Sequence, residues 1–474
     1  MMLLKDLADK ANVKFGTSGV RGLVKDLTPE LCFAYASAFI EGHKQTKKIA
    51  IGHDLRPSSP DITKACIAAA KFHDIEAIYL GNMPTPALAN FCLLRNVPGI
   101  VVTGSHIPFD RNGIKFYRPD GEISKDDELN ILNTEIDLPE FINLEELPSA
   151  DNEGIVAYKD RYLNFFGEDF LDGMLIGIYE HSSVARDFMH ELFSSLGAKT
   201  ISLGRTNEFK PIDTEAVRQD DIDRAINWAK NFTFDLLVST DGDADRPLIG
   251  DENGMFIKGD VIGVLTAKYL KLDHVVTPLT SNSLLEKSKL FRSTRRTKVG
   301  SPYVIEGMML NAKLNKDLVG GYEANGGFLL GSNVIKNSRM LPILMTRDAI
   351  LPILSIIGLS KELNLPVSRI ATTLPKRYMV STKIENFSKE NYMKMIRNIS
   401  KSTKSIIKFM MPSANSITET TKVDGFRVVF DTEQIVHLRP SGNAPELRIY
   451  IEDSTEENAI INLINVEKKC FEYV

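Results

Sequence analysis

The sequence has few cysteines and no long apolar run. Four cysteines occur among 474 residues, and none belongs to a CxxC pair, so the sequence suggests neither a zinc ribbon nor a disulfide framework and favours a reducing compartment. The apolar stretch AILPILSIIGL is too short to span a bilayer and contains Pro352, and the opening MMLLKDLADKANVK lacks the apolar core of a secretory signal. We therefore expect a cytoplasmic protein with no membrane partner.

Net charge is also small. The 57 basic and 62 acidic residues leave -5, which argues against a general nucleic-acid binder. The composition is otherwise that of a globular protein, with 43% hydrophobic and 25% charged residues. The chain is too long for one hydrophobic core, and at about 100–200 residues per domain it predicts roughly three or four domains.

Strands and helices alternate over the first three quarters of the chain. KKIAIGHD, EAIYLG and GIVVTGS are typical of strands, and SPDITKACIAAAKFHD, with Ser59 as N-cap, and PTPALANFCLLRN are typical of helices between them. The alternation returns from MLIGIYEH to FDLLVST, and again from GDVIGVLTAKYLKL to a long helix near 340–364. This order predicts parallel sheets with helices on both faces.

The last hundred residues follow another pattern. RYMVSTKIEN, GFRVVFD, QIVHLRP and ELRIYIED are typical of strands with turns between them, and a helix follows from about 455. We therefore predict three doubly wound, mixed α/β domains over 1–150, 151–252 and 253–368, and a smaller C-terminal α+β domain over 369–474.

The stretch STDGDADRPLI concentrates negative charge after a predicted buried strand. Asp241, Asp243 and Asp245 alternate there, and three carboxylates this close repel one another unless a cation joins them. Oxygen ligands suit Mg²⁺, Ca²⁺ or Mn²⁺. An EF-hand loop is an alternative, but its sixth position needs glycine and has Arg246, and a strand precedes it. A solvated acidic turn is the other alternative.

Ser105 follows the strand of VVTGSHIP. Open α/β sheets bind ligands at the carboxyl ends of their strands, and a serine at this position could therefore be a nucleophile. A plain turn after the strand is the alternative. Asn112-Gly113 predicts a hairpin turn that folds Lys115 back toward Ser105, where an ammonium neutralises phosphate or moves a proton. The neighbouring His106 suggests a hydrolase, but TGSHI lacks the GxSxG pattern.

Three glycine-rich stretches fit binding loops, or plain turns. KFGTSGVRGLV combines hydroxyls and Arg21 with backbone amides, which suits a phosphate, although it lacks the GK[ST] ending of a P-loop. LRPSGNAPELRIY places Arg439 and Ser441 between two strands and suits a dianionic phosphate. GGYEANGGFLL places Glu323 and Asn325 where a carboxylate and an amide could bind sugar hydroxyls.

Together these stretches resemble one family. FGTSGVRG, TGSHIP with NGIK, DGDADR, KVG, YEANGG and RPSGNAP occur in the order found in the α-D-phosphohexomutases, the phosphomannomutase/phosphoglucomutase group. The resemblance covers essentially the whole chain. It implies a four-domain, heart-shaped architecture around a central cleft, with one motif loop from each domain.

The resemblance also implies roles for these residues. Ser105 would carry a phosphoryl group and, with Asp241, Asp243 and Asp245, would hold one Mg²⁺ ion.

Charged groups are implied around the transferred phosphoryl group. These are Arg21, Arg246 and Lys115, with Lys115 as the candidate general acid/base and His106 at the border of the catalytic site. The residues implied to bind the substrate are Thr17, Ser18, Lys298, Glu323, Asn325, Arg439, Ser441, Gly442 and Asn443.

The sequence departs from the commoner patterns of the family. The serine loop often reads TASHNP, and here Gly104 and Ile107 replace the alanine and the asparagine. The sugar loop often reads GExSGH, and here Asn325 and Gly327 stand in place of the serine and the histidine. The phosphate loop often reads SGTEP, and here Ala444 replaces its carboxylate.

The implied activity is the reversible interconversion of hexose 6-phosphate and hexose 1-phosphate, with mannose favoured. It would pass through a phosphoserine and a hexose 1,6-bisphosphate, which also serves as activator. Phosphoglucomutase, a dual enzyme and phosphoglucosamine mutase are alternatives, as are a metal-dependent sugar phosphatase and a non-catalytic phosphosugar-binding protein. We expect a small-molecule phosphosugar as partner and a monomer or homodimer.

Overall fold

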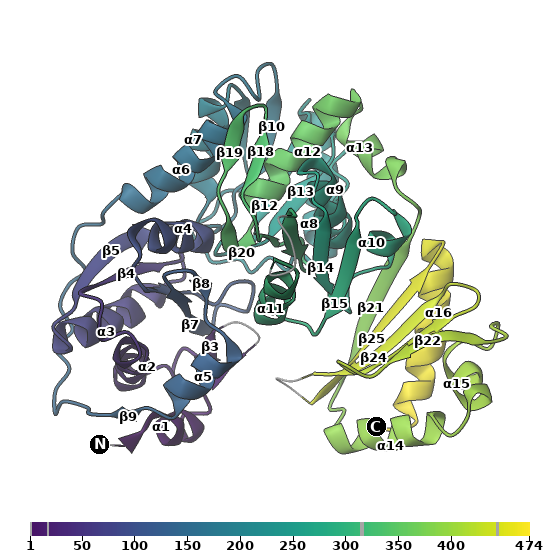
Figure 1. The fold of residues 1–474 in the computed structure, drawn as a ribbon, viewed down its shortest axis with the longest axis horizontal. Coiled ribbons are helices and arrows are strands. Elements are labelled where there is room, and N and C mark those ends of the chain that lie inside the picture. Colours follow the sequence, from purple (N-terminus) through teal and green to yellow (C-terminus); the bar gives the residue numbers. More distant parts are fainter. Residues whose placement is uncertain (1, 17–18, 313–316, 442–444) are drawn as a thin grey trace. The chain divides into compact units, whose positions relative to one another are not determined.

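The computed structural model describes the chain except residues 1, 17–18, 313–316 and 442–444. Thr17, Ser18, Gly442 and Asn443, predicted to bind substrate, therefore lie outside the described residues. The chain divides into two compact units (Figure 1). Unit 1 comprises Met1–Val276 with Gly300–Ala371, and unit 2 comprises Thr277–Val299 with Thr372–Val474.

The first sheet of unit 1 has the order β2-β3-β7-β6-β4-β5. β4 pairs in parallel with β5 and β6, and β6 pairs antiparallel with β7, so the sheet is mixed. The parallel part confirms the predicted β-α-β-α-β unit. The strands are β2 (Lys14–Phe15), β3 (Val20–Leu23), β4 (Lys48–His53), β5 (Glu76–Asn82), β6 (Gly99–Val102) and β7 (Arg111–Arg118), with β8 (Gly121–Glu122) paired to β7.

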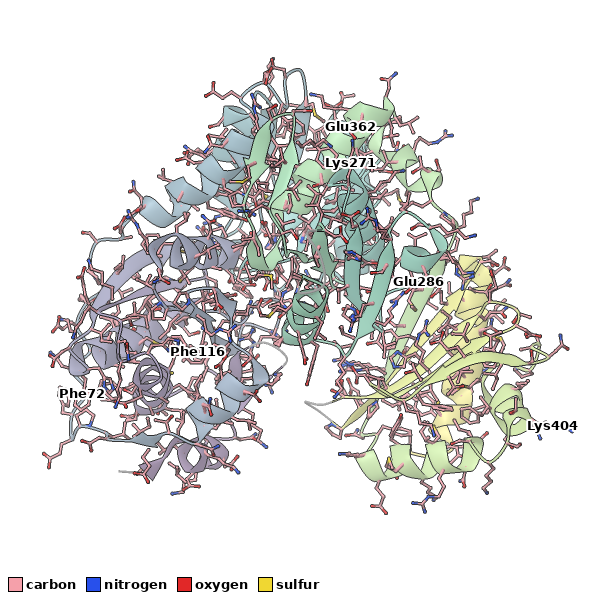
Figure 2. The ribbon with its side chains drawn as sticks, in the orientation of Figure 1. Phe72, Phe116, Lys271, Glu286, Glu362 and Lys404 are labelled. Atoms are coloured by element: carbon pink, nitrogen blue, oxygen red, sulfur yellow. The ribbon has the colours of Figure 1, made fainter. Side chains whose placement is uncertain are left out.

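Helices cover both faces of this sheet. α2 (Pro29–Glu41) and α3 (Ser59–Phe72) share one apolar core with Ile49, Ile51 and Ile100 of the strands. α4 (Thr85–Arg95) lies on the other face, where a side chain at Gly99 would meet Cys92. Figure 2 shows Phe116 of β7 inside this region, and its ring centroid lies 4.9 Å from that of Phe39. Smaller elements are β1 (Met2–Leu3), α1 (Leu4–Lys10), α5 (Lys125–Leu132) and β9 (Glu135–Ile136).

Three local predictions were wrong. Asn112-Gly113 is no turn, because both residues lie inside β7, where Asn112 Oδ1 accepts a hydrogen bond from the Gly113 N–H. The N-cap of α3 is Ser58, and Ser59 begins the helix and donates its hydroxyl to Asp54. The predicted long helix near 340–364 begins only at Ile350, because 344–348 form a strand.

Unit 1 contains two further large sheets. One has the order β11-β10-β12-β13, with β10 and β12 parallel and β13 antiparallel to β12. The other runs β14-β16-β17-β20, with β14 and β16 parallel. The strands of these two sheets are β10 (Leu175–Tyr179), β11 (Lys199–Leu203), β12 (Leu236–Thr240), β13 (Pro247–Gly250), β14 (His274–Pro278), which the unit boundary crosses, β16 (Val319–Tyr322), β17 (Phe328–Leu330) and β20 (Leu344–Asp348). A separate antiparallel pair is formed by β18 (Val334–Lys336) and β19 (Arg339–Leu341). The helices are α6 (Glu153–Phe166), α7 (Arg186–Ser195), α8 (Gln219–Asn231), α9 (Gly259–Tyr269), α11 (Ser301–Ala312), α12 (Ile350–Leu363) and α13 (Val367–Ile370).

Unit 2 confirms the predicted antiparallel α+β organisation. Its five-stranded sheet has the order β21-β25-β24-β23-β22, and all the pairs are antiparallel. The strands are β21 (Tyr378–Glu385), β22 (Ile417–Thr421), β23 (Phe426–Phe430), β24 (Ile435–Pro440) and β25 (Glu446–Asp453), and α16 (Glu456–Phe471) is the predicted final helix. The unit also holds α10 (Leu284–Lys287) and β15 (Ser293–Thr297).

The sequence analysis did not predict α14 (Lys389–Ile399) and α15 (Thr403–Met410) of unit 2. Their N-caps, Ser388 and Ser402, accept hydrogen bonds from the third helical N–H, which is a recognisable start signal. Lys404 of α15 is exposed at the edge of the unit (Figure 2). Among the described residues, no single helix is long and apolar enough to cross a membrane, and Ile350–Leu363 with Val367–Thr373 would qualify only as a pair bent by 82°.

Candidate active site

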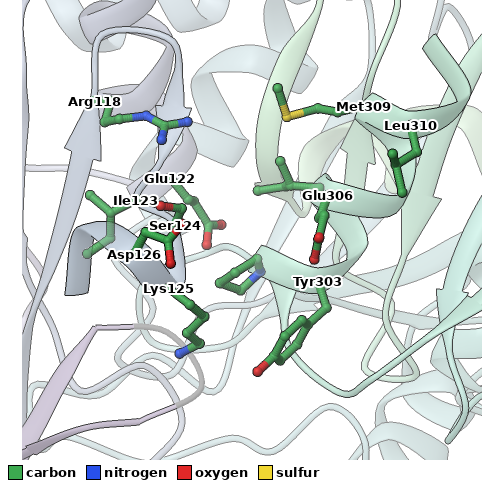
Figure 3. A pocket seen from close by; sticks show the side chains of 12 residues that line it. Arg118, Glu122, Ile123, Ser124, Lys125, Asp126, Tyr303, Glu306, Met309 and Leu310 are labelled. Atoms are coloured by element: carbon green, nitrogen blue, oxygen red, sulfur yellow. The ribbon is translucent and has the colours of Figure 1, made fainter. Parts of the chain in front are cut away.

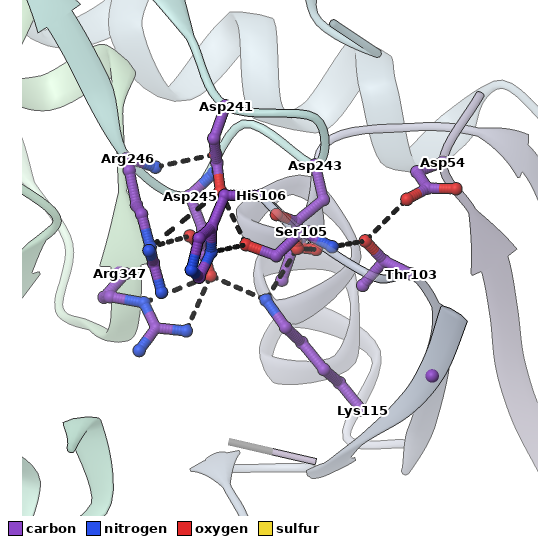
Figure 4. A network of polar contacts seen from close by, with 12 residues as sticks. Asp54, Thr103, Ser105, His106, Lys115, Asp241, Asp243, Asp245, Arg246 and Arg347 are labelled. Atoms are coloured by element: carbon purple, nitrogen blue, oxygen red, sulfur yellow. Dashed lines mark hydrogen bonds and ion pairs between the residues drawn. The ribbon is translucent and has the colours of Figure 1, made fainter. Parts of the chain in front are cut away.

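Ser105 lies at a tight turn just beyond the carboxyl end of β6. Its φ is +54°, a left-handed conformation that costs free energy for a residue with a side chain and is found at functional sites. Its backbone N–H donates to Thr103 Oγ1 at 2.8 Å, and the Thr103 hydroxyl donates to Asp54 Oδ2 at 2.7 Å. The turn therefore presents the Ser105 hydroxyl, which donates to Asp241 Oδ2 at 2.6 Å (Figure 4).

Arg56 holds the serine loop, residues 105–111, through its backbone. Its guanidinium is 1% exposed and donates to four backbone carbonyls, those of Ser105, Ile107, Pro108 and Arg111, at 2.6–2.9 Å. An added Cβ at Gly104 would lie 2.4 Å from Arg56 Cζ. Glycine in place of the commoner alanine therefore leaves room for this guanidinium.

The three aspartates form the hairpin loop between β12 and β13. All three side chains are fully buried, and one oxygen of each lies within 4.8 Å of the others. Oδ1 of Asp243 and Oδ1 of Asp245 are buried and have no hydrogen-bond partner among the described residues. Unsatisfied buried carboxylate oxygens are costly, and they are the ligands that Mg²⁺ prefers. The donor set therefore fits a divalent cation, and the preceding strand excludes an EF-hand.

Basic side chains surround the same carboxylates. Lys115 Nζ donates to Oδ2 of Asp243 at 2.6 Å and to Oδ2 of Asp245 at 2.7 Å. Arg246 Nε lies 3.5 Å from Asp245 Oδ1 and 3.9 Å from Asp241 Oδ2. Lys115 thus reaches the site as predicted, but along strand β7 rather than through a hairpin turn.

The surroundings shift the pKa values of Asp241 and Asp245 in opposite directions. Burial, then the proximity of Asp243 and Asp245, raises the pKa of Asp241 well above its usual range. Burial also acts to raise the pKa of Asp245, but Arg347, Lys115 and Arg246 outweigh it and hold that pKa below its usual range. A bound cation would neutralise the negative charge of the three carboxylates and so relieve the repulsion among them.

His106 and Arg21 lie beside the serine loop as predicted. His106 Nδ1 is 3.4 Å from Ser105 Oγ, and burial, followed by Arg246 and Arg21, holds the pKa of His106 well below its usual value, so the ring is neutral. Arg21 Nη1 donates to the carbonyl of Thr103 at 3.0 Å, and burial lowers the pKa of Arg21 to about 10.

The predicted sugar loop joins β16 to β17 in unit 1. Glu323 and Asn325 are both buried, and Asn325 Oδ1 accepts a hydrogen bond from the Gly327 N–H at 3.0 Å. Thr214 donates to the Asn325 carbonyl at 2.8 Å and so anchors the loop. Glu323 Oε2 accepts a hydrogen bond from Arg347, which ties this loop to the aspartates.

Three further predicted substrate residues that the structure describes, Lys298, Arg439 and Ser441, lie in unit 2. Arg439 Nε donates to Asp424 Oδ1 at 2.9 Å, and the N–H of Val299, next to Lys298, donates to Asp424 Oδ2 at 2.9 Å. Asp424 therefore brings the segment of Lys298 together with the loop of Arg439 and Ser441. The sequence analysis missed Asp424.

A cavity of about 480 Å³ lies elsewhere in unit 1, between the start of α5 and α11. Figure 3 shows Arg118, Lys125 and Tyr303 among its lining side chains. None of the lining residues is a predicted site residue, so we do not assign the reaction to this cavity.

Three family models match most of the residues of unit 1. The family models described as phosphoglucomutase/phosphomannomutase, alpha/beta/alpha domains I, II and III, match residues 12–138, 160–254 and 258–378 in that order. The chain belongs to the phosphoglucomutase/phosphomannomutase family. It has the three α/β/α domains of that family and a further C-terminal domain, and it is a phosphomutase, an isomerase.

Two relatives are similar in sequence to nearly the whole chain. A phosphomannomutase of Salmonella muenchen is 44% identical over 459 residues, which are 96% of this chain and 95% of that protein. A phosphomannomutase of Sinorhizobium fredii is 39% identical over 93% of this chain and 94% of that protein. The solved structure of a phosphoglucomutase/phosphomannomutase family protein from Burkholderia thailandensis matches with a TM-score of 0.75 and 16% identity over 100% of this chain and 98% of that one.

Sequence reasoning missed several residues that support this phosphomutase site. Asp54 and Arg56 follow strand β4 directly, and a charged pair after a predicted buried strand is a signal that could have identified them. Arg347 gave no such signal, because the sequence analysis placed it inside a long helix.

Proposed function

We propose that the chain is a phosphomannomutase that converts mannose 6-phosphate and mannose 1-phosphate into each other. The observation that carries the proposal is the hydrogen bond from Ser105 Oγ to Asp241, which places the buried hydroxyl of a left-handed turn residue on a buried three-carboxylate cluster. The names of the relatives support mannose as the sugar.

The proposed reaction moves one phosphoryl group at a time. The free hydroxyl oxygen of the sugar phosphate forms a bond to phosphorus as the bond from phosphorus to Ser105 Oγ breaks. The hydroxyl proton passes to Ser105 Oγ, which regains its hydroxyl, and a hexose 1,6-bisphosphate results. The bisphosphate turns over and returns its other phosphoryl group to Ser105 by the reverse step, so the enzyme is unchanged and a trace of bisphosphate serves as activator.

The chain's own residues position this transfer. Arg56 and the Thr103–Asp54 pair fix the serine loop, and the ammonium of Lys115 lies where negative charge gathers on the phosphoryl oxygens. Neutral His106, 3.4 Å from Ser105 Oγ, can accept a proton. Asp241, Asp243, Asp245 and the serine phosphate would hold Mg²⁺, which when bound supplies charge stabilisation to the transferring phosphoryl group.

A coupled assay tests the proposal. Mannose 1-phosphate, glucose 1-phosphate and glucosamine 1-phosphate are compared with Mg²⁺ and a trace of hexose 1,6-bisphosphate. Best turnover of mannose 1-phosphate supports the proposal, and comparable glucose turnover indicates a dual enzyme. Release of inorganic phosphate, or no isomerisation of any sugar, contradicts it. Ser105→Ala should abolish turnover, whereas Ser355→Ala, a buried serine in α12, should retain it.

A further inference from the structure

Arg347 contacts carboxylates from two separate loops. It lies near the end of β20, is 2% exposed, and donates to Asp245 Oδ2 from Nη2 at 2.7 Å and from Nε at 3.1 Å. Its remaining arm, Nη1, donates to Glu323 Oε2 at 2.8 Å. Figure 4 shows the guanidinium directed at the aspartate cluster. One side chain therefore joins the candidate sugar loop to the candidate metal loop.

The sugar loop is shaped to admit this arginine. A Cβ at Gly327 would lie 2.7 Å from Arg347 Cδ and 2.9 Å from the carbonyl oxygen of Asp245. The commoner loop pattern has histidine at this position, and a side chain there cannot coexist with Arg347 as placed. Glycine at position 327 therefore leaves room for Arg347 in this chain.

Only a guanidinium satisfies both contacts. Its planar fork offers several N–H groups in fixed directions, so it can bind Asp245 with two of them and Glu323 with a third. A lysine ammonium at the same position is a single point charge on a flexible stem. Because Arg347 occupies Oδ2 of Asp245 and Oε2 of Glu323, its contacts leave Oδ1 of Asp245 for a cation and Oε1 of Glu323 for a substrate.

We propose that Arg347 is a positioning and specificity-determining residue, which fixes the sugar-reading carboxylate Glu323 and the metal-loop carboxylate Asp245 against one another. The Glu323 half of the proposal rests on the proposed function, whereas the Asp245 half does not. A hydroxyl of the wrong configuration that displaces Glu323 also disturbs Arg347 and therefore Asp245. Sugar discrimination and cation binding are thereby coupled.

The first measurement uses Mn²⁺ as the probe and needs no turnover. Binding is followed by the electron paramagnetic resonance signal of free Mn²⁺ for the full chain, for Arg347→Lys and for Arg339→Lys, an exposed arginine of β19 that serves as the matched control. We expect Arg347→Lys to weaken Mn²⁺ binding about tenfold, as for other residues that orient metal ligands. Arg339→Lys should leave it unchanged. Unchanged Mn²⁺ binding in Arg347→Lys overturns the Asp245 half.

The second measurement concerns the sugar. Binding of mannose 1-phosphate and glucose 1-phosphate is compared by calorimetry, and KM and kcat are measured for both. Arg347→Lys should raise KM more than it lowers kcat and should reduce the preference between the two sugars about tenfold or more, a loss of roughly one hydrogen-bond contact to a charged group. A preference within twofold of the original overturns the Glu323 half, even if the variant melts at a lower temperature.

A double-mutant cycle identifies the route. Glu323→Gln keeps the shape of the side chain and removes its charge. If Arg347 acts through Glu323, adding Arg347→Lys to Glu323→Gln should change the sugar preference by less than about twofold. Full additivity contradicts the proposal. If the unmodified chain isomerises no hexose phosphate, the proposed function fails, while Mn²⁺ binding and the calorimetric sugar preference still decide the role of Arg347.

Discussion

Lys115 Nζ lies 2.6 Å from Asp243 Oδ2, although 128 residues separate them in the sequence. The same oxygen accepts a hydrogen bond from the Thr85 hydroxyl at 2.6 Å. Two donors from the first sheet and its helix therefore satisfy one oxygen of a carboxylate that belongs to the second sheet. The other oxygen, Oδ1, is left without a partner among the described residues, which directs it to a cation.

Lys115→Met should lower kcat by about 10²–10⁴-fold. The substitution removes the charge beside the transferring phosphoryl group and takes away a cation that two buried carboxylates, Asp243 and Asp245, share. The assay is mannose 1-phosphate turnover, with a thermal melt to confirm folding. Lys48→Met is the control, because Lys48 forms only an exposed ion pair with Glu76. A folded Lys115→Met enzyme within tenfold of normal kcat would contradict this role.

Thr85→Val should weaken cation binding by about 10–100-fold, since the lost hydroxyl orients Asp243. The Mg²⁺ concentration for half-maximal turnover should rise accordingly, and so should the dissociation constant for Mn²⁺. Thr63→Val is the matched control, because Thr63 is equally buried but donates only to the Ser59 carbonyl within α3. Equal cation affinities in the two variants would show that Thr85 does not position the ligand.

Gly104→Ala should lower stability by about 1–3 kcal/mol and slow turnover, because its methyl group would displace the Arg56 guanidinium from the serine loop. This result is expected although alanine is common at this position in the family. Gly42→Ala, where an added Cβ comes no closer than 3.4 Å to its nearest neighbour, should be tolerated. Thermal melts and kcat report the outcome, and a Gly104→Ala protein indistinguishable from the original would contradict it.

His181 should make the stability of unit 1 depend on pH. Burial lowers the pKa of His181 to about 4, and its Nε2–H donates to the Thr240 carbonyl, while Nδ1 has no partner among the described residues. The unfolded chain binds a proton near pH 6.5 and the folded chain does not, so the free energy of unfolding falls as pH decreases from about 6.5 to 4. Between pH 7 and 5 the loss is about 2 kcal/mol.

The fluorescence of the single tryptophan, Trp228, can report the pH dependence of unfolding. Its ring lies 5.0 Å from that of Tyr179, which in turn lies 5.2 Å from the ring of His181. Urea unfolding is followed by its fluorescence at pH 7 and pH 5 for the original chain and for His181→Gln, whose amide can still donate to Thr240. The variant should lose this part of the pH dependence. Identical pH dependence in both proteins would exclude His181 as the cause.

Much of the site could be predicted from local sequence. Ser105, the three aspartates and Glu323 each follow an apolar strand, and a strand that ends in small polar residues indicates a loop at the edge of a sheet. The Asn112-Gly113 turn was wrong because the pairing of β7 between β3 and β6 overrode a local turn preference. The predicted start of α12 was wrong because residues 344–348 pair with β17 as a strand. An apolar run alone does not distinguish a strand from a helix.

The sequence by itself determined the alternating α/β organisation, the antiparallel C-terminal unit and which loops carry the chemistry, because apolar periodicity and local residue types express these directly. Only the tertiary structure decided which oxygens of the aspartates are held by Lys115, Thr85 and Arg347, and which remain for a cation. It also decided that Gly104 and Gly327 make room for two arginines. These relationships join residues tens to hundreds of positions apart, and burial in one low-dielectric site, rather than any local pattern, gives them their strength.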